Sequence, residues 1–198
     1  MNTLRITRLD PTGYRRTPWK NGGGVAIEIA SASLADSATG TWHDTIWSFG
    51  RTTIETAAPF SDFSGFDRMQ VVVRGRGLVL QTPSGEIDLR QPGVPARFAG
   101  HTPIVTRLEA GPVEVVNLIG DRRRVAIDLV LLAAGHAVVL SSGLHLLYAA
   151  FEPSLLRCDG VEHALLLDHG LQLDCVGDVT ISCVEGRALI GSVFSNPP

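Results

Sequence analysis

Residues 69–80 read Met-Gln-Val-Val-Val-Arg-Gly-Arg-Gly-Leu-Val-Leu, and this stretch decides the fold class. Two apolar runs are separated by Gly75 and Gly77, a pattern that predicts two strands joined as a hairpin. Similar short apolar runs, bounded by glycine or proline, lie on both sides of this stretch. They cover residues 25–29, 46–49, 87–89, 104–108 and 113–118. Short strands at this spacing predict an all-β sandwich or barrel.

The composition excludes several classes of partner. A net charge of −3 over 198 residues offers no electrostatic basis for binding nucleic acid or an anionic membrane. The most apolar stretch, residues 125–140, is shorter than the ~20 residues of a membrane span, and residues 1–9 lack the apolar run of a signal peptide. The cysteines are odd in number and form no Cys-x-x-Cys unit; they are Cys158, Cys175 and Cys183. We therefore expect a soluble, cytoplasmic protein with reduced thiols.

A faint internal repeat predicts two units. Residues 65–75 align without gaps to residues 160–170, with both end glycines, an acidic residue and a basic residue in common. Such a repeat suggests duplication of a half-barrel. We predict a first half over residues 1–124 and a second half, packed on it, over residues 125–198.

The segment Pro18-Trp19-Lys20-Asn21-Gly22-Gly23-Gly24 is a candidate anion site. Consecutive glycines allow backbone N–H groups to form an anion-binding nest, and Lys20 and Asn21 add donors beside it. No nucleotide-binding glycine motif is present. The alternative is a tight turn that leads into the strand at Val25.

The second candidate spans residues 59–68, where Phe60, Phe63 and Phe66 are expected to pack a corner of the barrel. A guanidinium at Arg68, at the start of a strand, suits recognition of a carboxylate. The alternative is an ion pair of Arg68 with Asp67 or Glu28. A third candidate, Asn117, lies near the end of an apolar strand, where its amide binds either a ligand or backbone groups.

These motifs occur in the order typical of the HutD/Ves family, which the chain resembles from about Trp19 to Arg124. The resemblance implies a cupin-like (RmlC-type) β-barrel, a bicupin of two jelly-roll-like halves, and a homodimer. The histidine-utilisation branch of that family implies a carboxylate ligand such as urocanate or formylglutamate. One departure is Ala26-Ile27, which stands where the family usually has Thr-Arg and so removes one candidate anion contact. The matching segments are residues 18–24, 28–29, 60–68, 75–78, 98–100, 111–118 and 122.

No metal or other cofactor is expected, because the six histidines form no His-x-His pair of the kind that metal cupins use. Two hypotheses remain: a binding protein for a small acidic metabolite, or a metal-free isomerase or hydrolase. In the second, Glu28 or Asp67 would act as base and Arg68 would fix the carboxylate. We favour binding, since no titratable pair has a recognisable catalytic spacing, and we assign no catalytic residue. The predicted ligand-binding residues are Lys20, Asn21, Gly22, Gly23, Gly24, Glu28, Ser61, Phe63, Asp67, Arg68 and Asn117.

Overall fold

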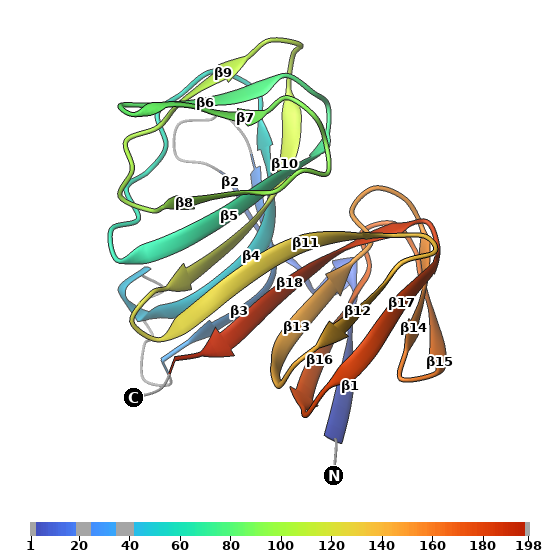
Figure 1. Cartoon of the computed structure of the whole chain (residues 1–198). Coiled ribbons are helices and arrows are strands. Elements are labelled where there is room, and N and C mark those ends of the chain that lie inside the picture. The colour runs from blue at the N-terminus through green and yellow to red at the C-terminus, as the bar shows by residue number, and fades with distance from the viewer. Residues whose placement is uncertain (1–2, 19–24, 35–41, 197–198) are drawn as a thin grey trace. The chain divides into compact units, whose positions relative to one another are not determined.

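The computed structural model describes residues 3–18, 25–34 and 42–196 and is built almost entirely of strands. The described helices are two single 3-10 turns, η1 (Pro11–Gly13) and η2 (Trp42–Asp44). In this part of the chain no helix is long and apolar enough to cross a membrane. The chain divides into two compact units (Figure 1).

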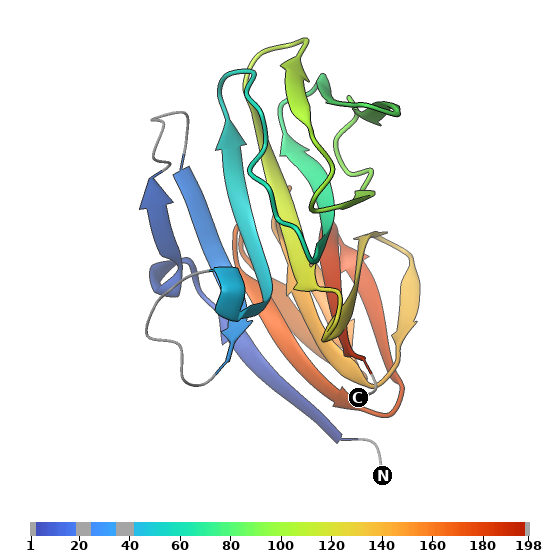
Figure 2. The same ribbon diagram turned by 90° about the vertical axis from the view of Figure 1, so that its left-hand side faces the viewer.

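The N-terminal unit comprises Tyr14–Ile127 and the chain end from Asn196. It contains a six-stranded sheet and a three-stranded sheet, all antiparallel. The larger sheet has the order β2 (Arg15–Pro18), β3 (Val25–Ser33), β4 (Thr45–Ile54), β10 (Val113–Asp121), β5 (Phe66–Arg74) and β8 (Ala96–Ala99). Figure 2 shows its first five strands side by side, from blue through cyan and yellow to green. The smaller sheet has the order β7 (Gly85–Leu89), β6 (Leu78–Thr82) and β9 (Val105–Leu108).

The C-terminal unit comprises Met1–Gly13 and Asp128–Ser195. Its five-stranded sheet has the order β1 (Thr3–Leu9), β16 (Gly170–Val176), β13 (Gly143–Tyr148), β18 (Arg187–Ser195) and β11 (Val125–Ala133). Its four-stranded sheet has the order β12 (Ala137–Leu140), β17 (Val179–Glu185), β14 (Ser154–Cys158) and β15 (Val161–Leu165). The strand orders are open, so the sheets form jelly-roll-like layers and not a closed barrel.

The two units repeat one pairing order. The order β4-β10-β5-β8 in one unit corresponds to β11-β18-β13-β16 in the other, and β7-β6-β9 corresponds to β15-β14-β17. The counterpart of β5 is therefore β13 and not the β15 segment that the alignment of residues 65–75 with 160–170 proposed. That alignment is wrong, although the fold is duplicated. Gly65 and Gly160 match because both have positive φ in the turn before a strand.

The N-terminal strand is the main difference from the predicted division at residues 124 and 125. β1 pairs along its whole length with β16, from Thr3–Val176 to Leu9–Gly170. Residues 1–13 consequently belong to the C-terminal unit. The reason is a long-range strand pairing, which short sequence patterns do not reveal.

The predicted hairpin at residues 69–80 is also wrong. Strands form on both sides of Gly75 and Gly77, but β5 joins the six-stranded sheet and β6 the three-stranded one. Both glycines have positive φ, and a Cβ on Gly75 would lie 2.5 Å from the Pro112 carbonyl oxygen. The glycines therefore let the chain pass from one sheet to the other beside the neighbouring backbone.

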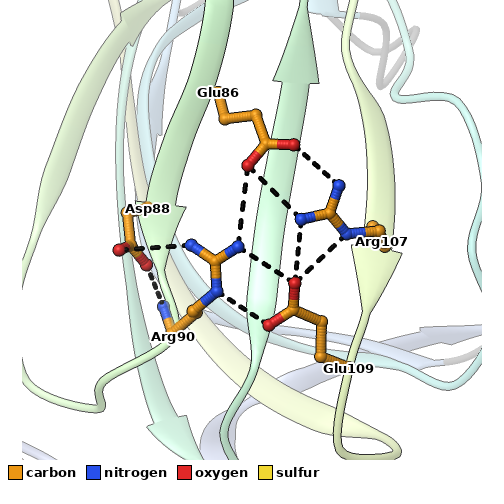
Figure 3. A network of polar contacts seen from close by, with 5 residues as sticks. All are labelled: Glu86, Asp88, Arg90, Arg107 and Glu109. Carbon is orange, nitrogen blue, oxygen red and sulfur yellow. Dashed lines mark hydrogen bonds and ion pairs between the residues drawn. The ribbon is translucent and has the colours of Figure 1, made fainter.

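Charged side chains tie the three-stranded sheet together on one face (Figure 3). Arg107 on β9 lies 2.7 Å from Glu86 on β7 and 2.8 Å from Glu109. Arg90, just after β7, lies 2.7 Å from Glu109 and 3.2 Å from Asp88. Since β6 lies between β7 and β9, the network spans the whole width of this small sheet.

Each unit has its own apolar core. In the C-terminal unit, fifteen buried side chains form one cluster, which includes all three free cysteines. Leu4 and Ile6 of β1 pack against that cluster. In the N-terminal unit, a smaller cluster is centred on Val72, Leu78, Leu80 and Leu89.

Candidate functional site

A pocket of about 630 Å³ lies within the N-terminal unit, between one face of the six-stranded sheet and the segment 58–63. This volume is in the range of small-molecule sites in proteins. Side chains from β3, β4, β5 and β10 line it. Its charged lining residues within the described chain are Glu28 and three arginines, Arg15, Arg51 and Arg68, so cationic groups are in excess.

The strand register explains why polar residues gather in the pocket. Glu28 pairs with Gly50, Gly50 with Asn117, and Asn117 with Gln70, so these four residues form one row across the sheet. Residues opposite each other on paired strands point to the same face. The next row contains Arg68, opposite Ile119. All five line the pocket.

Gly50 stands in this row because β3 approaches it closely. A Cβ at position 50 would lie 2.6 Å from the carbonyl oxygen of Ile27. No side chain can occupy that space without moving the backbone. Gly50 therefore contributes backbone atoms, and no side chain, to the pocket wall.

Arg68 carries the most unusual charge in the pocket. Its residue is 6% exposed, and its Nη2 donates a hydrogen bond to Oδ1 of Asn117 over 3.1 Å. Its Nε has no hydrogen-bond partner. Burial lowers the pKa of Arg68 to about 10, which still leaves the guanidinium charged at neutral pH.

Three aromatic rings surround this guanidinium. Its Cζ lies 4.8 Å from the ring centre of Phe60, 5.0 Å from that of Phe63 and 5.1 Å from that of Phe98. Aromatic faces attract a cation, but they do not neutralise it. Arg68 thus has cation–π contacts and one neutral hydrogen-bond acceptor, and no carboxylate of the described residues forms an ion pair with it.

The ion pairs considered for Arg68 are therefore wrong. Asp67 is adjacent to Arg68 on β5, so its side chain points to the opposite face. Its carboxylate accepts a hydrogen bond from Arg122 over 2.8 Å. Glu28 accepts one from Arg15 over 2.9 Å. Arg68 is also the third residue of β5 and not its first.

Gln70 is the second deeply buried polar side chain in the pocket wall. It is 1% exposed, and its Oε1 accepts no hydrogen bond. Thr106, also 1% exposed, has a different role, because its hydroxyl accepts from the Ala58 amide over 2.9 Å and donates to the Ala58 carbonyl. Thr106 therefore fixes the start of the segment that covers the pocket.

Trp42 on η2 adds an exposed aromatic side chain to the lining. Its ring meets Phe63 edge to face with the centres 4.5 Å apart, and it remains 43% exposed. Aromatic pairs in this geometry are favourable. Trp42 can contact both a molecule in the pocket and the solvent.

The predicted site residues fall into three groups. The pocket brings together Glu28, Ser61, Phe63, Arg68 and Asn117. Asp67 lies outside it, for the reason given above. Lys20, Asn21, Gly22, Gly23 and Gly24 lie outside the residues that the structure describes.

Sequence reasoning missed Gln70 and Trp42 as pocket residues and Phe98 as a contact of Arg68. Gln70 could have been found, because it is two residues after Arg68 and therefore on the same face of the strand. Phe98 is opposite Arg68 across the β5–β8 pair, a long-range pairing with no local signal.

The described residues give little support for a metal site or for a cysteine nucleophile. They contain no group of three or more His, Cys, Asp or Glu side chains that could hold a metal ion. The cysteines are buried in the C-terminal core, and burial raises the pKa of Cys158 to about 11. A thiol that stays protonated at neutral pH is a poor nucleophile.

Comparison with known proteins finds a family model and a relative that both point to the hut genes. The family model described as HutD matches residues 12–184. An uncharacterized 21.2 kDa protein in the hutC 3' region of Pseudomonas putida is 31% identical over 119 residues, which are 60% of this chain and 59% of that protein. The match to this curated relative thus spans less than two thirds of its length.

Solved structures extend the similarity over nearly the whole chain. HutD from Pseudomonas fluorescens SBW25, in a formate condition, has a TM-score of 0.79 and 26% identity, and the match covers 98% of this chain and 100% of that one. A conserved protein of unknown function from Pseudomonas aeruginosa PAO1 has a TM-score of 0.80 and 23% identity with the same coverage. The predicted all-β, cupin-like fold is confirmed.

Proposed function

The chain belongs to the HutD family, and from this premise we propose that its pocket binds a small carboxylate metabolite. The observation that carries the proposal is the buried guanidinium of Arg68, which has no carboxylate partner among the described residues. Removing a charge from water is unfavourable unless an opposite charge compensates it. A carboxylate in the pocket would supply that compensation.

The lining favours an anion for a second reason. The Glu28 carboxylate is already engaged by Arg15 and by the hydroxyl of Ser31 over 3.0 Å. Arg51 lies 3.7 Å from Glu114, so Arg68 is the lining charge that an anionic ligand would compensate. The aromatic rings around Arg68 exclude water and so strengthen a charge-assisted hydrogen bond. The pocket thereby combines a few polar groups with an apolar surround, as small-molecule sites usually do.

Histidine utilisation supplies the candidate ligands. The Pseudomonas putida relative is described by its place beside hutC, and urocanate and formylglutamate are the carboxylates that the family resemblance implied. We propose an accessory or regulatory role, in which the protein holds one of these metabolites and does not transform it. The proposal includes a cytoplasmic location and a homodimer, the latter tested by light scattering during gel filtration.

A second candidate function is a metal-free isomerase or hydrolase with Glu28 as base. The observation that favours it is the presence of Glu28 and Arg68 in the same pocket. Asp67 has no part in it, since it lies outside the pocket. Product analysis after prolonged incubation with each bound carboxylate separates turnover from simple binding.

Calorimetric titration with urocanate and formylglutamate tests the binding proposal. We expect at least one to bind, and Arg68→Met to weaken that binding about tenfold or more, because a charge-assisted hydrogen bond contributes roughly 1.5–3 kcal/mol. Arg68→Lys should restore only part of the affinity, since an ammonium lacks the planar fork.

The matched control is Asp67→Asn, which changes the neighbouring charge on the opposite face of β5. It should leave the affinity unchanged. Equal affinity of the wild type and Arg68→Met for every carboxylate that binds would refute the proposal.

A further inference from the structure

Gln70 has a buried side-chain carbonyl oxygen to which no described residue donates a hydrogen bond. The residue is 1% exposed and lines the pocket, and its Oε1 has no hydrogen-bond partner. Its partner on the neighbouring strand β8 is Ala96, which offers no polar side chain. A buried acceptor without a partner destabilises a fold, so its presence in a pocket wall points to a role in binding.

The neighbours of Gln70 are hydrogen-bond donors. Arg68 lies two residues away on the same face of β5, a separation of about 7 Å between Cα atoms. Asn117 lies opposite Gln70 on β10, and its Oδ1 already accepts from Arg68. The Asn117 amide nitrogen can only donate. The deep wall of the pocket therefore offers donors at Arg68 and Asn117 and one acceptor at Gln70.

We infer that Gln70 accepts a hydrogen bond from the ligand, so that the pocket selects a small carboxylate that also carries an N–H or O–H donor. The inference rests on the proposed function, because Arg68 must first bind the carboxylate. The donor of the ligand then lies one side chain further along β5. A simple carboxylate without a donor leaves the Gln70 oxygen unpaired and binds more weakly. Sites built to hydrogen-bond a ligand group discriminate strongly against analogues that lack it.

A pair of ligands of matched shape tests this selection. Urocanate carries an imidazole N–H, whereas 3-(2-furyl)acrylate keeps the planar ring and the carboxylate but has no N–H. We expect the wild-type protein to bind urocanate at least tenfold more tightly in calorimetric titrations. Gln70→Leu should reduce the affinity for urocanate at least tenfold and leave that for furylacrylate within about threefold.

Melting temperatures separate a binding role from a structural one. Gln70→Leu replaces an unpaired buried acceptor by an apolar side chain of similar volume. The variant should therefore melt at or above the wild-type temperature. Gln81→Leu, at an exposed position on β6, serves as the control for a glutamine outside the pocket. It should change the affinity for neither ligand.

The outcomes distinguish the two proposals. If both ligands bind the wild type equally and depend on Arg68, carboxylate binding holds and the role of Gln70 is overturned. If Gln70→Leu melts at a lower temperature and weakens both ligands alike, Gln70 is structural and the inference fails. If neither ligand binds, this inference is overturned, whereas the carboxylate proposal is decided by the titration with formylglutamate.

Discussion

The buried charge of Arg68 disfavours the folded state but favours the binding of an anion. Its guanidinium stays charged at neutral pH, although burial lowers its pKa to about 10 and, among the described residues, only Asn117 accepts a hydrogen bond from it. Replacing a poorly compensated buried charge by an apolar group is often neutral or stabilising. By this principle we expect that the fold does not require the charge of Arg68.

A melting experiment follows from this argument. We expect Arg68→Met without ligand to melt at the wild-type temperature or above it, because the change removes a buried charge that no described carboxylate compensates and keeps most of the side-chain volume. Differential scanning calorimetry measures both proteins. A fall of several degrees would show that Arg68 supports the fold and would favour a structural role over binding.

His145 provides a second prediction at the level of one residue. It is fully buried, its Nε2 donates to the Ser141 carbonyl over 2.9 Å, and its Nδ1 accepts from the Ser192 hydroxyl over 2.8 Å. Burial lowers the pKa of His145, so the folded protein holds it neutral. Above pH ~6.5 the unfolded chain is neutral at this residue too, and no pH dependence arises.

Below that pH the unfolded chain binds the proton first, so the His145 contribution to stability falls as the pH falls towards the folded-state pKa. The slope has an upper limit of about 1.4 kcal/mol per pH unit. Urea titrations between pH 5 and 8 should show a shallower dependence for His145→Gln than for the wild type. Parallel curves for the two proteins would contradict the assignment.

The residues of the site could be predicted from the sequence only in part. Arg68, Asn117, Ser61, Phe63 and Glu28 were identified as candidates, and all five line one pocket. Asp67 was wrong because adjacent strand residues face opposite sides. The rings around Arg68 come from two separate segments, residues 58–63 and β8, and no local pattern encodes that arrangement.

At the level of the element, the charged network of the three-stranded sheet predicts a measurable pH dependence (Figure 3). Hydrogen bonds from Arg90 and Arg107 lower the pKa of Glu109 to about 2. Its contribution to stability is therefore present above pH ~4.5, the ordinary range for glutamate, and is lost as the pH falls through about 2.

Glu109→Gln should consequently lower the melting temperature at pH 7 and lose that effect progressively below pH ~4.5. High salt should also reduce the difference, because these charges are exposed and screened. Glu162→Gln, which breaks the isolated surface pair of Arg157 and Glu162, is the control and should have a smaller effect. Equal effects of both substitutions at every pH would show that the network adds nothing beyond separate pairs.

The sequence predicted most strands but not their partners. The two apolar runs and the glycines of residues 69–80 located β5 and β6, yet the structure assigns these strands to different sheets. The alignment of residues 65–75 with 160–170 was wrong for a similar reason. Gly65 and Gly160 both lie in turns before strands, but they do not occupy the same position in the two units. Strand formation is a local property, whereas pairing depends on contacts that are distant in sequence.

For the whole molecule, the N-terminal strand has the largest consequence. β1 pairs with β16 over its full length (Figure 1). Leu4 and Ile6 of β1 pack against the core of the C-terminal unit. Deleting residues 1–13 would expose the edge of β16 and part of that core. Unpaired strand edges and exposed apolar surface reduce stability and promote aggregation.

We expect the deletion to raise amide hydrogen exchange first in β16 and β13, while β4, β5 and β10 keep their protection. Hydrogen exchange with mass spectrometry measures both units in one experiment. Loss of protection in the N-terminal unit alone would contradict the assignment of residues 1–13 to the C-terminal unit.

The fold class of the whole molecule was accessible from sequence, because the short apolar runs between turn residues and the family motifs agreed on a duplicated, all-β, cupin-like protein. The sequence did not reveal that the two units differ in the side chains of their interiors. The C-terminal unit has an apolar core of aliphatic and cysteine side chains. The N-terminal unit instead places polar residues in register across several strands, which only the pairing reveals.

The central claim is that the N-terminal pocket binds a carboxylate at Arg68, and a crystal structure of the protein soaked with urocanate tests it most directly. We predict density for the ligand in the pocket, with a carboxylate oxygen within hydrogen-bond distance of the Arg68 guanidinium. The Arg68→Met protein, soaked in the same way, should show no ligand there. Urocanate bound elsewhere, or bound in this pocket with its carboxylate away from Arg68, would contradict the account.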